Sequence, residues 1–209
     1  MARLIYVMDP MCSWCWGFAP VMQALADQAL EQGVSLELRV GGLRREQMVM
    51  DQAGRERTVS YWQAVHSATG QPFNLDQGLP EGLIYDTEPV CRALVAARGL
   101  DGARVWSLSL LIQQAFYERG QDVTRAALLV ELAKEAGLPR SQFAERYDDP
   151  ATGIATAADF TWVENLGIAG FPTLLAEHEG QLALLTNGYQ TLPVLAPLLA
   201  RWLERNAHG

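Results

Sequence analysis

The chain has 209 residues, of which 49% are apolar and 19% are charged, and its formal net charge is −8. This length fits one large domain, or one domain with another inserted into it, built around a globular core. The acidic charge argues against nucleic-acid binding, which needs clustered Lys and Arg, and no apolar stretch reaches the ~18–20 residues of a membrane span.

The chain opens with an apolar run, RLIYVM at residues 3–8, which predicts a buried first strand. Asp9 and Pro10 follow it and are expected to end that strand. The opening residues show no long apolar segment followed by a small-residue cleavage site, so they do not resemble a secretory signal peptide. We therefore expect a cytoplasmic protein.

A helix and a second strand are predicted next. Apolar residues recur at helical spacing over residues 16–32, and Gly33 follows as a typical helix stop. Residues 34–42, VSLELRVGG, alternate apolar and polar side chains, as a half-buried strand does. Strand, helix and strand in this order indicate a βαβ unit, whose first strand-to-helix turn holds Cys12 and Cys15.

The pattern changes after this unit, because residues 43–149 show almost only helical periodicity. Glycines and prolines divide this stretch into predicted helices at 45–70, 88–98, 103–119, 124–136 and 140–147. Asp122 or Thr124 is the expected N-cap of the helix at 124–136. One more helix is predicted at 152–166.

The last part of the chain returns to strands. Two apolar runs joined by Glu179 and Gly180 predict a hairpin, and residues 192–205 predict a final helix. Each β-bearing part is too small to bury a sheet alone, so we expect one shared sheet with helices on its faces. This predicts a discontinuous domain of residues 1–43 and 151–209, interrupted by a helical insertion domain at residues 44–150.

The stretch DPMCSWCWGF, residues 9–18, places Cys12 and Cys15 three positions apart at the start of a predicted helix. A helix N-terminus favours an anion such as a thiolate, through its free N–H groups and its dipole. We expect Cys12 to be the exposed nucleophile, and Cys15, one turn on and less exposed, to resolve the mixed disulfide. Ser13 and Trp14, between them, are candidate substrate-binding residues.

Two other interpretations of the cysteine pair stay open, namely half of a metal site and two inert core residues. A structural zinc site needs about four ligands. Beyond the pair, the chain offers only scattered candidates, which are Cys91, His66, His178 and His208. We therefore expect no metal, and Cys91, on an apolar helix face, is expected to be a buried structural thiol.

Aromatic side chains surround the pair and recur in the next predicted helix. We expect Trp16 and Phe18 to pack in the core and Trp14 to be exposed. Three neighbouring side chains of the helix at 45–70 are expected to complete the core rather than to line a cleft: Tyr61, Trp62 and His66.

Cys-x-x-Cys after a first strand, combined with Gly-Phe-Pro-Thr before a later strand, resembles the DsbA-like family of thioredoxin-fold thiol oxidoreductases. The resemblance covers nearly the whole chain. It implies an α/β, thioredoxin-like fold in the order β-α-β … α-β-β-α, with a large all-helical insertion. The stretch DPMCSWCWGF further resembles the leaderless, cytosolic branch of that family, whose members are predicted protein-disulfide isomerases.

The resemblance also implies roles for single residues. Pro172 is then a cis-proline that lies against the active-site disulfide, and Phe171 offers backbone groups to a bound peptide or thiol. Thr173 should begin the third strand close to the pair and is a further substrate-binding candidate. The secreted oxidants of the family carry Pro-His between the cysteines, whereas this chain carries Ser-Trp and lacks that histidine.

In a reducing compartment this pair should rest as the dithiol. The resemblance therefore implies a reductant or isomerase that acts on protein or small-molecule disulfides. It implies no metal and no organic cofactor, with glutathione as a candidate redox partner.

Two functions of other classes stay open. One is a glutathione-dependent transferase or isomerase, since the kappa-class glutathione transferases and the 2-hydroxychromene-2-carboxylate isomerases resemble this chain in the order of their elements. Those enzymes carry a serine at the position of Cys12 and have no redox pair. The other is a non-enzymatic adaptor that holds a client on the same scaffold. The sequence also leaves the oligomeric state open.

Overall fold

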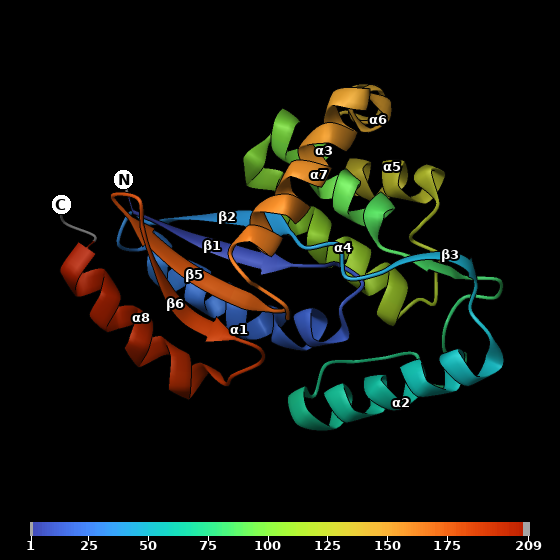
Figure 1. Ribbon diagram of the computed structural model, residues 1–209, viewed down its shortest axis with the longest axis horizontal. Helices are drawn as coiled ribbons and strands as arrows, with labels where there is room; N and C mark the ends of the chain where they lie inside the picture. The colour runs from blue at the N-terminus through green and yellow to red at the C-terminus, as the bar shows by residue number, and fades with distance from the viewer. Residues whose placement is uncertain (1, 207–209) are drawn as a thin grey trace.

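The computed structural model of the chain describes residues 2–206. Its centre is a four-stranded sheet in the order β2-β1-β5-β6 (Figure 1), formed by Ser35–Val40, Arg3–Met8, Thr173–His178 and Gln181–Asn187. Strands β1 and β2 run parallel, whereas β5 runs antiparallel to both β1 and β6. The N-terminal βαβ unit and the C-terminal hairpin therefore share one sheet, which confirms the predicted thioredoxin-like order.

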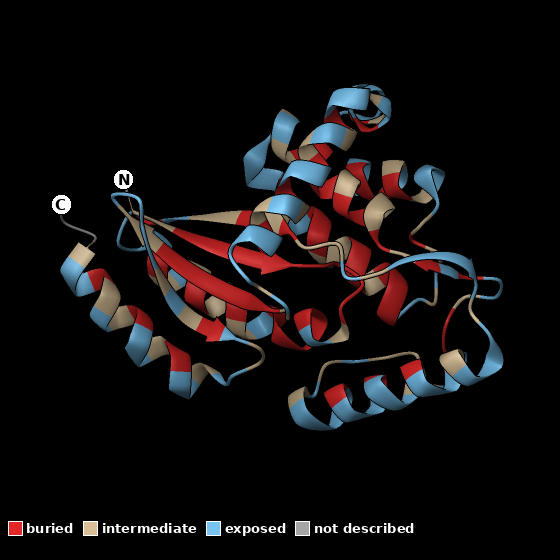
Figure 2. Cartoon of the chain, viewed as in Figure 1, coloured by how far each residue is buried: buried red, intermediate tan, exposed pale blue. Residues whose placement is uncertain are grey.

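Helices cover both faces of this sheet. Helices α1 (Ser13–Leu30) and α8 (Leu192–Asn206) pack on one face, and α7 (Pro150–Asn165) lies across the other (Figure 1). Side chains of β1 alternate between the two faces, so Tyr6 points into the main core while Val7 joins a smaller cluster under α7. Figure 2 shows β1 and β5 buried along most of their length.

The chain between β2 and β5 is mostly helical, as predicted. It forms α2 (Gln52–Thr69), α3 (Glu88–Leu100), a short 3-10 helix (Gly102–Arg104), α4 (Val105–Tyr117), α5 (Ala126–Glu135) and α6 (Arg140–Asp148). Helices α3 to α6 pack together (Figure 1). Helix α2 contacts α1, and its Trp62 packs against the rings of Phe116 and Tyr117 in α4. The division into two domains at residues 43/44 and 150/151 stays a prediction.

The helix predicted at 45–70 begins later than predicted, at residue 52. Residues 45–49 form strand β3 (Arg45–Val49), which pairs antiparallel with β4 (Ile84–Asp86). Helix α2 begins only after Asp51, whose carboxylate caps it by accepting a hydrogen bond from the Gly54 N–H at 2.7 Å. The strand pairing joins distant residues, so helical periodicity within residues 45–70 could not reveal it.

The N-cap expected for α5 is also wrong. This helix begins at Ala126, and Arg125 occupies the N-cap position without a side-chain hydrogen bond. Asp122 instead accepts hydrogen bonds from the N–H and hydroxyl groups of Thr124, at 3.1 and 2.6 Å. The two residues therefore stabilise the turn that precedes the helix. Residues 2–206 include no helix long and apolar enough to cross a membrane.

Candidate active site

Cys12 lies where strand β1 gives way to helix α1. It is the N-cap residue, with extended backbone angles (φ −87°, ψ 116°), and its carbonyl accepts hydrogen bonds from the N–H groups of Cys15 and Trp16 at 3.0 and 3.1 Å. No side chain caps this helix. Its first N–H groups are therefore free to stabilise negative charge on the sulfur of Cys12.

Both cysteines are free thiols, and both are largely buried. Cys12 exposes 6% of its surface and Cys15 exposes 1%. Cys12 is thus the more exposed of the two, as predicted, but it is not openly exposed. A disulfide can reach Cys12 only at the small part of the residue that is exposed, which we call the opening.

The segment before β5 forms one side of this opening. The peptide bond between Phe171 and Pro172 is cis, as the resemblance implied for that proline. The Cys12 thiol lies 3.7 Å from the carbonyl oxygen of Phe171. Thr173 begins β5, and its hydroxyl donates to the Gly170 carbonyl at 2.9 Å. The structure therefore brings the cysteine turn and the predicted proline segment together.

Two glycines that sequence reasoning counted only as the end of a strand shape this segment. A Cβ on Gly41 would lie 1.9 Å from Cζ of Phe171, so the phenyl ring packs directly on the glycine backbone. Gly42 has φ +65°, and a Cβ there would lie 2.9 Å from the Phe160 ring. A Gly-Gly pair at the end of a strand indicates a close approach by some other group, but the sequence does not show that Phe171 and Phe160 are the groups that approach.

Asp9 lies in the interior, directly before the cysteine turn. It is completely buried and accepts hydrogen bonds from the N–H groups of Met11 at 2.8 Å and Leu43 at 2.7 Å. Cys91, the predicted buried thiol, lies 3.5 Å from the same carboxylate. Burial raises the pKa of Asp9, and these hydrogen bonds offset part of that increase. Asp9 thus joins the cysteine turn to the chain after β2 and to α3.

Cys15 faces the interior of the protein. Burial is the largest cause that raises the pKa of its thiol, and the neighbouring Cys12 raises that pKa further. The thiol is therefore the stable form of Cys15 while the pair is reduced. This environment suits a cysteine that loses its proton only when it attacks another sulfur.

The aromatic side chains next to the cysteines are placed as expected. Trp14 is 36% exposed, and its ring lies 5.7 Å from that of Tyr189, which sequence reasoning did not single out. Trp16 and Phe18 are buried, and the indole N–H of Trp16 donates to the Pro72 carbonyl at 2.8 Å. Trp14, next to the half-buried Tyr189, therefore provides exposed aromatic surface beside the cysteine pair.

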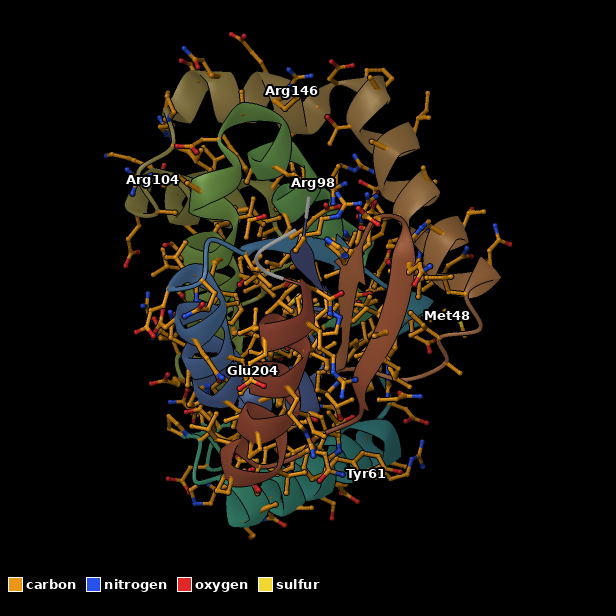
Figure 3. The ribbon with its side chains drawn as sticks, turned by 90° about the vertical axis from the view of Figure 1, so that its left-hand side faces the viewer. Met48, Tyr61, Arg98, Arg104, Arg146 and Glu204 are labelled. Atoms are coloured by element: carbon orange, nitrogen blue, oxygen red, sulfur yellow. The ribbon has the colours of Figure 1, made fainter. Side chains whose placement is uncertain are left out.

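The expected core role of three residues in α2 is confirmed only for Trp62, which is buried. Tyr61, labelled on α2 in Figure 3, and His66 are exposed. Within residues 2–206, no group of three or more His, Cys, Asp or Glu side chains could hold a metal ion. His208 lies outside the described residues.

Comparisons with known proteins identify the family of the chain. The model of the DSBA-like thioredoxin domain family matches residues 3–200. A proposed protein disulfide isomerase from Nitrosomonas europaea is 37% identical, with a TM-score of 0.90 over 100% of this chain and 99% of that one. The cytosolic disulfide reductase DsbM from Pseudomonas aeruginosa is 31% identical, with a TM-score of 0.78 over 97% of each chain.

Two further matches extend this comparison. A structure of DsbM with GSH is 30% identical to this chain, with a TM-score of 0.76. Among curated proteins, the ClpXP adapter protein SpxH from Halalkalibacterium halodurans is 23% identical over 174 residues, or 80% of this chain. This match spans 56% of SpxH, so the chain corresponds to little more than half of that relative's length.

Proposed function

The chain belongs to the DSBA-like thioredoxin domain family of thiol–disulfide oxidoreductases, and we propose that it is a cytosolic disulfide reductase or isomerase. One observation carries this proposal. The sulfur of Cys12 lies at the uncapped N-terminus of α1, 3.7 Å from the Phe171 carbonyl, and Cys15 is buried one turn further on. This arrangement supplies an attacking cysteine and a resolving one.

Reduction of a substrate disulfide would proceed in two exchanges. The Cys12 thiolate attacks one substrate sulfur, the substrate S–S bond breaks, and the departing thiolate takes up a proton. Cys15 then loses its proton and attacks the sulfur of Cys12, which releases the second substrate thiol. The substrate gains two electrons and the protein is left with a Cys12–Cys15 disulfide. A thiol reductant such as glutathione would return the pair to the dithiol.

The residues around the opening would bind the substrate. Trp14 offers exposed aromatic surface, and Ser13 begins α1 beside it. Phe171 would present its backbone to the substrate chain, while Pro172 and Thr173 hold that segment against the pair. We assign no metal or organic cofactor to the reaction, because the cysteine pair itself carries the electrons.

The residues between the cysteines favour a reductant over a strong oxidant. The histidine that the family's secreted oxidants carry at this place is replaced by Trp14. Likeness to DsbM, a cytosolic disulfide reductase also solved with GSH, supports the same choice and supports glutathione as the redox partner. A transferase would need Cys12 alone, and an adaptor would need neither cysteine, so both alternatives are separable by experiment.

The test is an equilibrium titration of the reduced and oxidised protein in glutathione buffers, followed by the fluorescence of Trp14 and Trp16. We expect a two-electron transition that Cys12→Ser abolishes and that Cys91→Ser, the matched control, leaves in place. Its midpoint separates reductant from oxidant, because about 30 mV changes the equilibrium tenfold. Thiols that stay free throughout the titration would contradict the proposal.

A second assay distinguishes the alternatives. Turnover of a protein disulfide with glutathione should slow strongly in Cys15→Ala, because the mixed disulfide can then be resolved only by glutathione from solution. Full turnover of glutathione with an electrophile in that variant would instead indicate a transferase.

A further inference from the structure

Buried polar groups without partners lie in the wall behind the cysteine pair. Within residues 2–206, the hydroxyls of Tyr6 in β1 and Tyr117 in α4, and both polar side-chain atoms of Gln113 in α4, have no hydrogen-bond partner. All three residues are fully buried. Since buried polar groups are nearly always paired in folded proteins, three such side chains call for an explanation.

Ring contacts and helix geometry place these three side chains between α4, strand β1 and the first turns of α1. Tyr117 stacks on Trp16 of α1, with ring centroids 6.2 Å apart and planes 8° apart. Tyr6 contacts Trp106 of α4 edge-on, at 6.1 Å. Gln113 lies between Trp106 and Tyr117 on the same face of α4, because spacings of seven and four residues return to one side of a helix. This face of α4 is therefore turned toward β1 and the first turns of α1.

Ring contacts place both tyrosines beside Cys15. The ring of Tyr6 lies 6.0 Å from that of Phe18, which is three residues beyond Cys15 on the same face of α1, and Tyr117 stacks on Trp16, the residue after Cys15. Burial is the largest cause that raises the pKa of Tyr6, followed by Cys15 and then Cys12. Burial also raises the pKa of Tyr117, and both cysteines are among the groups that raise it further. The titratable groups that face Cys15 are thus Cys12, Asp9 and these two tyrosines. Both tyrosines keep their protons at neutral pH.

We propose that Tyr6 and Tyr117, together with Gln113, form a polar pocket that donates hydrogen bonds to the sulfur of Cys15 while it attacks the mixed disulfide. The inference rests on the proposed function, because only a resolving cysteine has to become an anion inside the protein. A neutral Cys15 thiol is a weak hydrogen-bond acceptor and gains little from these donors. The thiolate that develops during the attack is a strong acceptor. Donors that are unpaired in the resting protein therefore stabilise the transition state more than the resting state.

The resolving step balances without any further redox partner. The Cys15 thiol gives up its proton to solvent, its sulfur bonds to Cys12, and the bond between Cys12 and the substrate sulfur breaks. The departing substrate thiolate takes up one proton from the solvent. Tyr6 and Tyr117 keep their protons throughout and act only as donors to the sulfur.

The test uses Tyr6→Phe and Tyr117→Phe, which each remove one hydroxyl and keep the ring. Reduced protein is mixed rapidly with glutathione disulfide, and Trp fluorescence follows the attack by Cys12 and the later attack by Cys15. We expect the second, concentration-independent phase to slow about tenfold in each variant. Its pH profile should move upward by about one unit, while the first phase stays unchanged. The control is Tyr147→Phe, a buried tyrosine of α6, which should alter neither phase.

A second measurement separates this role from a structural one. In a Cys12→Ser background, the ¹³C shift of the Cys15 Cβ should titrate at higher pH once Tyr6→Phe is added. The melting temperature should stay level or rise, because the variant removes an unpaired buried hydroxyl. An unshifted Cys15 titration with an unchanged second phase in both tyrosine variants would overturn the inference. A parent protein with no second phase would overturn the proposed function itself.

Discussion

Gly41→Ala is expected to disturb the active site without touching either cysteine. The added Cβ would lie 1.9 Å from Cζ and 2.3 Å from Cε1 of Phe171, whereas carbon atoms pack at about 3.5–4.0 Å. The ring must therefore move by roughly 1.5 Å or more. Because the Phe171 carbonyl lies 3.7 Å from the Cys12 sulfur, this movement should displace backbone beside Cys12 that we propose to face the substrate.

We expect the overlap to destabilise the protein by about 1–3 kcal/mol, as overpacked cores do. Urea unfolding measures this change, and the second-order rate of reduced protein with glutathione disulfide should fall as well. Gly153→Ala is the matched control, since nothing lies within 4 Å of the Cβ that it adds in α7. It should stabilise the protein by about 0.5–1 kcal/mol and leave the rate unchanged.

A double-mutant cycle tests the physical cause. Phe171→Ala removes the ring and keeps the backbone carbonyl, so Gly41→Ala should cost little when added to that variant. The reasoning would be refuted if Gly41→Ala cost the same free energy of unfolding in both backgrounds. It would also be refuted if the single variant matched the parent in both stability and rate.

Three further substitutions probe the scaffold and the opening. Asp159 binds Arg98 at 2.8 Å, and the Arg98 side chain is 26% exposed. Asp159→Ala should therefore lower the free energy of unfolding in urea by about 2–3 kcal/mol, less than the loss of a fully buried pair; an unchanged midpoint would contradict this. Because the folded-state pKa of Asp9 is raised, its contribution to stability falls as pH rises from about 4 through that pKa. Asp9→Asn should remove this component, so the parent should lose stability relative to the variant over that range. Trp14→Ala should slow reduction of an unfolded protein's disulfide more than that of glutathione disulfide, because it removes exposed surface beside Tyr189; equal slowing would argue against a role in substrate binding.

The sheet and its flanking helices could be predicted because their signals are local. The alternation in residues 34–42 and the hairpin at Glu179–Gly180 indicate strands from within a few residues. Strand β3 carried no such signal, since all five of its residues are exposed. Its only structural definition is a pairing with β4, more than thirty residues further along the chain.

Within the active site, the predicted residues were those whose types carry chemistry. Cys12, Cys15 and Pro172 could be found because the motif and the family resemblance point to them. Tyr6 and Gly41 could not, because their importance depends on which side chains lie behind or above them. An apolar strand containing a tyrosine and a strand ending in glycine are common, and only tertiary packing places them beside the cysteine pair.

The two cysteines occupy opposite environments, and this difference would determine the order of the reaction. Cys12 lies at a helix N-terminus beside the opening, where negative charge is stabilised. Cys15 lies three residues deeper, where burial favours its neutral form until a sulfur is within reach. Ser13 and Trp14, which lie between the cysteines, do not determine how deeply either cysteine is buried. They would therefore tune the potential and the choice of substrate, while burial decides which cysteine attacks first.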